Sequence, residues 1–435
     1  MTKADFEKYI APMGTHRMYG QTPQGFKDWM PERRWTRRAE MMKLVGPDIY
    51  KGITTDGNVV PDLYALRDEN APTESILNAV EHLFARLTPE QKRNTILPID
   101  SIEKHGWQNG IPDYDDFGFR LDEVGTPTRD AALALLRASM SAEGYERARN
   151  VMKLNGYLGE LVGAPKLLGE FCYRVHVFGQ PSSTEPWGWQ FSGHHLCITF
   201  FVLGSQMVMT PIFMGVEPNT CDEGQFKGAQ AFQDEEYNGL LLAQSLDADQ
   251  RRKAIFANSI LEKDLPKGRF QGFDGLCYGG AYRDNQVVPY EGILGDDLTH
   301  KQWQKMMDLA RSYLITLPEG PLDAKMEDLE KHRGQTQFCW AGGLEQRGVF
   351  YYRIQSPVTM IEFDHHWGVV LNNPQPERFH IHTTVRTPNG NDFGLDLLRL
   401  HLKNAKHDHD HDHGGGGGGH SHSHDHTHDH SHSHT

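Results

Sequence analysis

The sequence predicts an α+β fold, in which helices pack on an antiparallel β-sheet built from hairpins, followed by a disordered tail. Three observations support this expectation. Helical periodicity dominates residues 1–165, short β-branched and aromatic runs dominate residues 166–406, and residues 407–435 consist mainly of His, Asp, Ser and Gly. Because consecutive strands are predicted to form hairpins rather than βαβ units, an antiparallel sheet is favoured over a parallel one.

The composition is that of a globular protein, since 38% of the 435 residues are hydrophobic and 23% are charged. A net charge of -14 disfavours nucleic acid and anionic lipid as partners. No apolar run reaches the roughly 20 residues that cross a bilayer, and the N-terminus lacks the apolar core of a signal peptide. We therefore expect a cytoplasmic protein with no membrane or nucleic-acid partner, unless a leader was removed before Met1.

Two segments of the first portion have the pattern of amphipathic helices. Residues 71–87 (APTESILNAVEHLFARL) place apolar side chains three and four positions apart. The stretch TPTRDAALALLRASMS supplies Thr126 as a candidate N-cap and Pro127 for the first turn. The helical portion is therefore expected to contain at least these two helices.

Two segments of the chain show a weak sequence similarity to each other. LTPEQKRNTIL begins at Leu87 and LDADQRRKAIF begins at Leu246, and each places a Gln three positions after a capping residue. Common helix-capping chemistry explains such a similarity, so an internal duplication is the less favoured interpretation.

From Phe171 onward the hydrophobic pattern becomes that of strands. Runs such as FCYRVHVFG, HHLCITFFVLG and VTMIEFDH are short and are bounded by Gly, Pro or Asn. Hairpin turns are predicted at residues 203–205 and 355–357. Helical segments such as FQDEEYNGLLLAQSL lie between the strands, which agrees with helices packed on a sheet.

The tail differs from the rest of the chain. Residues 407–435 contain 12 of the 25 histidines, which alternate with Asp, Ser or Thr around a run of six glycines. Such a segment cannot bury a core and is expected to be disordered. Imidazole with carboxylate suits divalent zinc, copper, nickel and cobalt. We therefore predict a metal-binding tail, with a solubilising or appended tail as the alternative.

Histidine pairs in or beside the strands predict a metal site in the body. In H-x-H, His380 and His382 share one strand face and can bind the same ion. His194 and His195 are adjacent, so a regular strand would contribute only one of them unless Gly193 forms a bulge. The expected ligands are therefore His380 and His382 with His194 or His195. A third pair is weighted less heavily, namely His365 and His366.

Carboxylates close to these strands complete a mixed N/O ligand set of the kind used by zinc, iron and copper. Glu362 and Asp364 lie on one strand face, and Glu217 follows the first hairpin. We expect Glu362 or Glu217 to act as a metal ligand or general base. Either carboxylate could instead form a hydrogen bond with the free ring nitrogen of a ligand imidazole.

Two further residues are candidates for substrate binding. Arg386 lies four residues past His382 on the same strand face and could bind a carboxylate with its guanidinium. Asp392 follows in a Gly/Asn turn at the strand exit. Three tryptophans either wall a pocket or fill the core, and the core is favoured: Trp187, Trp189 and Trp340.

The segments WGWQFSGHH from Trp187 and HIHTTVRTPNGNDFG from His380 resemble an uncharacterised family known as domain of unknown function 3500. FGQPSS, TPIFMGVEPN and YYRIQSPVTMIEFD extend the resemblance in the same order. It covers most of the body and excludes the tail. It implies one continuous α+β domain over residues 1–406 and no particular reaction.

Several common catalytic motifs are missing, including GxGxxG, GxxxxGK[ST], GxSxG and HExxH. The five cysteines are an odd, widely spaced set without a CxxC pair, which disfavours a thiolate metal site. The leading hypothesis is a metal-dependent enzyme, an oxidoreductase that uses copper or non-haem iron on a small organic substrate. The alternatives are a zinc-dependent hydrolase with the same ligands and a non-catalytic metal carrier or storage protein.

Overall fold

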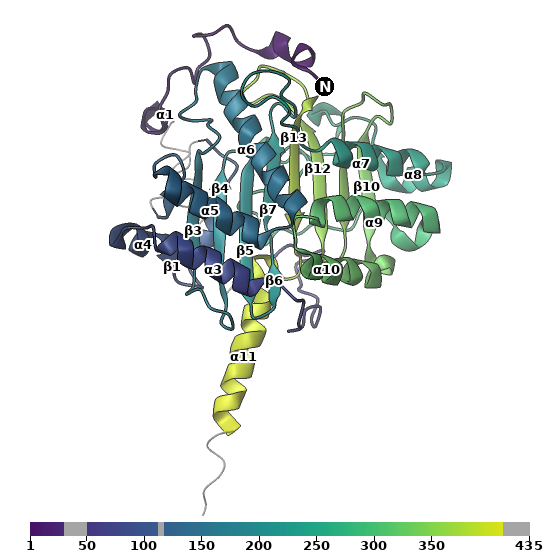
Figure 1. Ribbon diagram of the computed structural model, residues 1–435. Helices are drawn as coiled ribbons and strands as arrows, with labels where there is room; N and C mark the ends of the chain where they lie inside the picture. The colour runs from purple at the N-terminus through teal and green to yellow at the C-terminus, as the bar shows by residue number, and fades with distance from the viewer. Residues whose placement is uncertain (30–49, 112–116, 412–435) are drawn as a thin grey trace, which may run out of the picture.

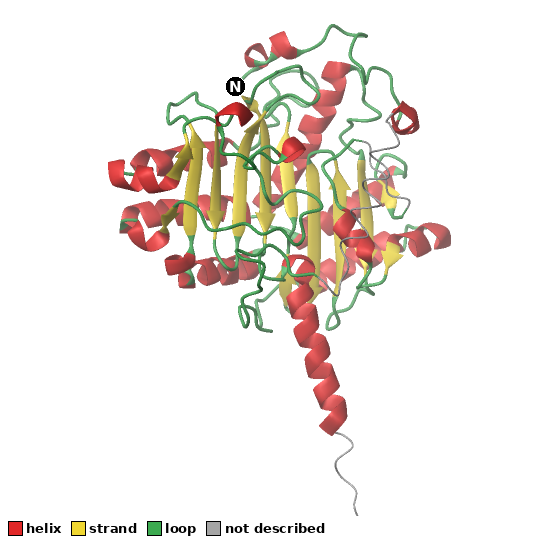
Figure 2. Ribbon diagram, turned by 180° about the vertical axis from the view of Figure 1, so that it is seen from behind, coloured by secondary structure: helices red, strands yellow, loops and turns green. Residues whose placement is uncertain are grey.

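In the part of the chain that the structure describes, a mixed sheet of thirteen strands forms the centre, with helices on one face and long loops on the other (Figures 1 and 2). The computed structural model describes residues 1–29, 50–111 and 117–411. The main path of the sheet is, in spatial order, β1 (Ile96–Leu97), β3 (Tyr173–Phe178), β4 (Trp187–Gly193), β5 (Leu196–Leu203), β7 (Ile212–Val216), β13 (Glu377–Arg386), β12 (Met360–His366), β11 (Phe350–Gln355), β10 (Gln337–Gly342) and β8 (Ile255–Ala257).

The α+β class is confirmed, but the sheet is mixed rather than purely antiparallel. The edge strands β1 and β8 run parallel to their neighbours β3 and β10, while the other pairs are antiparallel. Each parallel pair is separated in sequence by two helices, which provide the long connection that parallel strands need. Three short strands pair outside the main path, namely β2 (Phe119–Arg120) on β3, β6 (Gln206–Val208) on β5 and β9 (Ile293–Leu294) on β10.

The helices of the body come in two equivalent sets that cover the same face of the sheet (Figure 1). The first set is α3 (Thr73–Phe84), α4 (Pro89–Thr95), α5 (Thr126–Ser139) and α6 (Ala142–Val162). The second set is α7 (Gln233–Ser245), α8 (Ala248–Ala254), α9 (His300–Leu314) and α10 (Glu319–Lys331). The described part also contains short 3₁₀ turns and a small N-terminal helix, α1 (Pro23–Trp29).

The order of elements is repeated along the chain. The series α3, α4, β1, β2, α5, α6, β3, β4, β5, β7 matches α7, α8, β8, β9, α9, α10, β10, β11, β12, β13. The strand order reads the same from both edges, and the two halves meet where β7 and β13 pair in antiparallel fashion. The architecture therefore supports an internal duplication. From the sequence alone this was the less favoured interpretation, because common helix-capping chemistry explained the similarity.

The two similar segments, which begin at Leu87 and Leu246, lie at equivalent positions of the two halves. The helices α4 and α8 both begin with a reciprocal capping box, formed by Thr88 with Gln91 and by Asp247 with Gln250. Each helix leads directly into a parallel edge strand. The predicted helix at Thr126 also forms, but Gly125 takes the N-cap position and Thr126 is the first helical residue.

The two faces of the sheet differ in chemistry. Along β13, Phe379, Ile381 and Val385 belong to the main apolar core under the helices. The alternate residues of β13 and β12 lie on the other face, where loops cover polar side chains. The backbone N–H groups of Leu276, Tyr278 and Gly279, for example, donate to side chains of β12. All eight of these polar side chains on β12, β13 and the adjoining hairpin are buried, namely His194, His195, Glu362, Asp364, His366, His380, His382 and Arg386.

The tryptophans are core residues, as the sequence favoured. Trp187, Trp189 and Trp340 are at most 1% exposed, and their indole N–H groups donate to Ser182 O, Ser139 Oγ and Gly342 O. The two predicted turns also form, because Leu203 pairs with Gln206 and Gln355 pairs with Met360.

The C-terminal helix α11 (Leu395–His411) projects from the end of the body (Figure 1). Its last five residues, 407–411, are therefore helical, which corrects the expected start of the disordered tail. Extending an existing helix costs less than nucleating one, so a helix can run on into a sequence that would not fold alone. Residues 412–435 lie outside the described residues. None of the described helices is long and apolar enough to span a membrane.

Candidate metal centre

His194 and His195 form the two-residue turn between β4 and β5, in which Gly193 pairs with Leu196. His195 lies in the left-handed region with φ +63°. The turn geometry overrides strand alternation, so the two imidazoles do not point to opposite faces but stack with their ring centres 3.8 Å apart. A turn, rather than a bulge at Gly193, therefore directs these rings.

The turn meets β13 across a glycine of β7. Gly215 pairs with His382, and its N–H donates to His195 O at 2.8 Å. A Cβ atom at Gly215 would lie 3.0 Å from Cδ2 of both His195 and His382. Because only glycine leaves this space free, two hairpins far apart in sequence bring their imidazoles together here.

Three histidines converge at this point, namely His195, His380 and His382. One ring nitrogen from each lies within 4.8 Å of the other two. The Nε2 atoms of His380 and His382 are 3.1 Å apart. Two imidazoles bound at roughly 2.0–2.1 Å to a tetrahedral ion would place their nitrogens about 3.3–3.4 Å apart. The pair therefore already has the spacing of two ligands of one ion.

The electrostatics of this cluster suit metal ligation. Burial lowers the pKa of His195, His380 and His382 well below the usual value, and the neighbouring histidines lower it further. All three imidazoles are consequently neutral near pH 7 and keep a lone pair for a ligand. The Nδ1 atoms of His380 and His382 are buried and find no hydrogen-bond partner among the described residues. A buried polar atom without a protein partner calls for an explanation, and a bound ion or a water molecule nearby is one.

Glu217 lies behind the cluster rather than in it. Its Oε1 is 3.6 Å from Nδ1 of His380, on the side of the ring opposite Nε2. The carboxyl accepts N–H groups from Val369, Val370 and Leu371. Burial raises the pKa of Glu217 to about 8, although these N–H groups lower it. A carboxyl behind a ligating imidazole orients the ring and increases its basicity. At 3.6 Å the contact with His380 is too long for a hydrogen bond, so Glu217 lies next to the imidazole without binding it.

Replacing Glu217 by glutamine is expected to weaken metal binding by about 10–100-fold, the usual effect of losing a carboxylate behind a ligand histidine. The new amide side chain would keep an oxygen for the backbone N–H groups, so the fold should persist. Competition with a chromophoric chelator measures the affinity. The control is Glu185→Gln, which changes an exposed carboxylate beside His401. Equal affinities of both variants and the wild type would show that Glu217 does not support the ligand.

Glu362 is already saturated by hydrogen bonds. Its Oε1 accepts from Tyr278 N and Tyr351 Oη, and its Oε2 accepts from Gly279 N and Thr384 Oγ1. A carboxylate held by four donors in a buried site is poorly placed to accept a further proton or an ion. The structure therefore gives Glu362 a role in holding the loop around residue 278.

Asp364, which the sequence grouped with Glu362 on one strand face, lies beside the histidine cluster. It pairs directly with His382 across the β12–β13 ladder. Its Oδ2 accepts from Leu276 N, and its buried Oδ1 accepts no hydrogen bond from the part of the chain that the structure describes. Burial raises the pKa of Asp364 well above the usual value. Only the strand register reveals this neighbour of His382, because the sequence does not state which residues pair.

Arg386 and Asp392 lie together in a different buried network. Arg386 Nε donates to Asp392 Oδ2 at 2.7 Å, and its other nitrogens donate to Gly279 O and Asp284 Oδ1. Asp392 also accepts from Thr387 N. Among the described residues, no hydrogen bond joins this network to the three histidines. Arg386, the predicted substrate-binding residue, thus already donates its hydrogen bonds to groups of its own chain.

The remaining histidines border the cluster. His366 has its ring centre 4.1 Å from that of His382, but its nitrogens face Trp367 O and Phe273 O. His194 Nδ1 faces Asn155 Oδ1 at 2.8 Å. His365 lies on the opposite face of β12, where its Nε2 faces Glu236. Of the six paired histidines, three therefore converge and three have other polar partners.

Two asparagines that support the turn were not anticipated. Asn155 on α6 faces His194, and Asn109 Oδ1 accepts the backbone N–H of His195 at 2.8 Å. Both residues lie in the first, mainly helical portion of the sequence. Nothing local to an isolated asparagine signals such a contact, so only the packing of the two portions identifies them.

Comparison with known proteins agrees with the resemblance found in the sequence. The family described as "Protein of unknown function (DUF3500)" matches residues 69–395, which is about three quarters of the chain. No curated protein and no solved structure matches significantly. The matched region contains both halves of the duplicated sheet and the three converging histidines. The chain therefore belongs to the DUF3500 family.

Proposed function

We propose that this protein is a metal-dependent oxidoreductase in which His195, His380 and His382 bind copper or non-haem iron and a small organic substrate reacts beside the ion. The observation that carries the proposal is the convergence of three neutral, buried imidazoles within 4.8 Å. Imidazole suits copper, iron and zinc, and copper(II) binds most tightly among the divalent ions. Three protein ligands leave a coordination position open for a reactant, and a redox-active ion there would exchange electrons with it.

The placement of the carboxylates favours redox chemistry over hydrolysis. Many zinc hydrolases use a carboxylate as the general base beside the ion-bound water. The two predicted candidates for that base have other roles, because Glu217 contacts the far side of His380 and Glu362 accepts four hydrogen bonds. Asp364, which pairs with His382, keeps one oxygen that accepts no hydrogen bond within the described residues, so a carboxylate for hydrolysis is still present. A zinc hydrolase is retained as the second candidate, since three imidazoles with an open position are also a ligand set of catalytic zinc.

The histidine-rich tail supports the third candidate, a metal carrier without catalysis. Twelve histidines in residues 407–435 could bind several ions regardless of the body. If the tail is the only metal site, a chain that lacks residues 407–435 should lose nearly all of its metal. An enzyme should instead retain about one ion per chain in the body.

Elemental analysis tests these candidates together. The full chain and a variant that ends at Lys406 would be purified without an added tag, and their copper, iron and zinc contents measured. We expect about one copper or iron per truncated chain, with a visible absorption band or an electron paramagnetic resonance signal. A colourless protein that holds only zinc would contradict the redox proposal. A metal-free truncated chain would contradict both enzyme proposals.

A further inference from the structure

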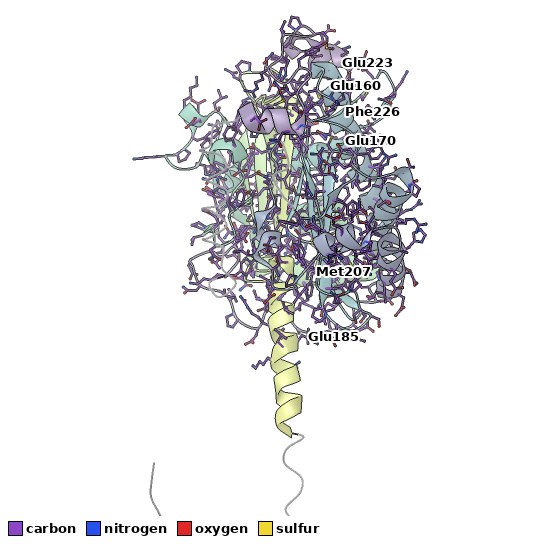
Figure 3. The ribbon with its side chains drawn as sticks, turned by 90° about the vertical axis from the view of Figure 1, so that its left-hand side faces the viewer. Glu160, Glu170, Glu185, Met207, Glu223 and Phe226 are labelled. Atoms are coloured by element: carbon purple, nitrogen blue, oxygen red, sulfur yellow. The ribbon has the colours of Figure 1, made fainter. Side chains whose placement is uncertain are left out.

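A separate cavity of about 270 Å³ lies at the end of β7 and β13 that is farther from the histidine cluster, on the helix-covered side of the sheet. Met207, which lines it, is labelled in Figure 3 toward the end of the body from which α11 projects, whereas Glu223 and Phe226 lie toward the opposite end. Thr210 of the lining is five residues from Gly215, which corresponds to roughly 16 Å along an extended chain. The cavity is therefore distinct from the histidine cluster.

Lys325 of α10 places its amino group in this cavity. Its Nζ donates to Val358 O at 2.7 Å and to Thr387 Oγ1 at 3.5 Å. An ammonium group has three N–H donors, so one donor is left after these two contacts. Within the described residues, Lys325 forms no ion pair, since the nearby carboxylates pair with Arg67 and Lys331. The cation thus lacks an anionic partner.

The acidic residues of the cavity wall are already paired with another cation. Arg67 donates from Nε to Glu69 Oε1 at 2.8 Å and from its terminal nitrogens to both oxygens of Asp328, at 3.0 and 2.7 Å. Lys331 adds a second cation 3.7 Å from Asp328. Glu69 and Asp328 therefore already form ion pairs with other cations, and Lys325 is left without an anionic partner among the described residues.

The surroundings of Lys325 disfavour its charge in the free protein. Burial lowers the pKa of Lys325 to about 8, although the more distant acidic groups raise it. Apolar side chains form much of the cavity wall, including Met207, Leu314 and Leu317. A half-buried cation next to an apolar surface is stabilised by an anion that brings its own apolar part.

We propose that this cavity binds a small organic monocarboxylate, whose carboxylate pairs with the Lys325 ammonium and the Thr387 hydroxyl and whose apolar part lies against Met207, Leu314 and Leu317. A single unpaired positive charge matches a monoanion. A volume of about 270 Å³ falls just below the range of roughly 300–1,000 Å³ typical of pockets for drug-sized ligands, which indicates a smaller molecule. The inference does not depend on the metal proposal.

Titration calorimetry of the full chain with benzoate, hexanoate, benzamide and inorganic phosphate tests the proposal. Benzoate or hexanoate should bind, and the neutral benzamide should bind about tenfold more weakly or worse than benzoate because it cannot form the charge-assisted contact. Failure of both carboxylates to bind at 10 mM, equal binding of benzamide, or binding of phosphate alone would each overturn the proposal. These comparisons need no altered protein.

Variants then locate the site. Lys325→Met removes the charge while keeping a flexible apolar chain, and should lower carboxylate affinity about tenfold or more. Lys325→Arg should retain most of the affinity, which separates loss of charge from damage to the fold. Lys331→Met is the matched control at the cavity wall and His382→Ala the control for the metal centre, and both should bind as the wild type does. Unchanged binding in Lys325→Met, or loss of binding in His382→Ala alone, would overturn the assignment.

Discussion

Replacing His382 by alanine is expected to remove the metal ion from the body of the protein. Its Nε2 is 3.1 Å from that of His380, and its ring is one of the three whose nitrogens converge. With two imidazoles left, the site lacks the third protein ligand that catalytic sites of this type use. We expect at least a 100-fold loss of affinity, of the order of 3 kcal/mol or more. Elemental analysis of the chain that ends at Lys406, with and without the substitution, measures the effect.

The same variant should also lose its metal-dependent stability. An ion present at about 1,000 times its dissociation constant stabilises the native state by about 4 kcal/mol. The wild type should therefore unfold at a higher temperature with metal than after treatment with a chelator, and His382→Ala should show no such difference. His401→Ala is the control, because His401 lies on α11 and faces the exposed Glu185. If His382→Ala retained one ion per truncated chain, the proposed centre would be wrong.

Replacing Arg386 by methionine is expected to destabilise the fold by about 3–5 kcal/mol, the usual effect of breaking a buried ion pair from one side. Arg386 and Asp392 are both fully buried, and Arg386 also contacts Asp284. Without the guanidinium, two buried carboxylates would lose their cation, and Gly279 O would lose a donor. Urea unfolding followed by far-UV circular dichroism gives the free energy of unfolding.

An exposed ion pair provides the matched control for this prediction. Arg252 pairs with Asp249 on α8, where the two side chains are 71% and 80% exposed. Arg252→Ala should therefore change the free energy of unfolding by no more than about 0.5 kcal/mol. If Arg386→Met were as stable as the wild type but bound substrate poorly, Arg386 would instead have the substrate-binding role suggested by its position after His382.

Local patterns were sufficient for several features of this protein. Strand periodicity located His380 and His382 on one face, because side chains two residues apart in a strand project together. Capping residues located the starts of α4 and α8, because Thr88 and Asp247 satisfy N–H groups that a helix cannot pair internally. Turn residues located the β5–β6 and β11–β12 hairpins. Each of these features depends on neighbours within a few positions in the chain.

Relations between distant segments could not be obtained in this way. Only the β4–β5 turn and the glycine at position 215 place His195, rather than His194, beside β13. Only the fold shows that Glu217 contacts His380 and that Arg386 is enclosed by Asp392 and Asp284. The parallel edge strands and the duplicated halves likewise emerged from strand order.

The physical reason is the range of the interactions concerned. By itself the sequence determined which residues form helices, strands and turns, since backbone conformation and side-chain periodicity act over a few residues. The tertiary structure decided which strands become neighbours and which polar groups share a buried space. That choice depends on burying the apolar surface of the whole chain while pairing its buried polar groups, and no short segment contains this information.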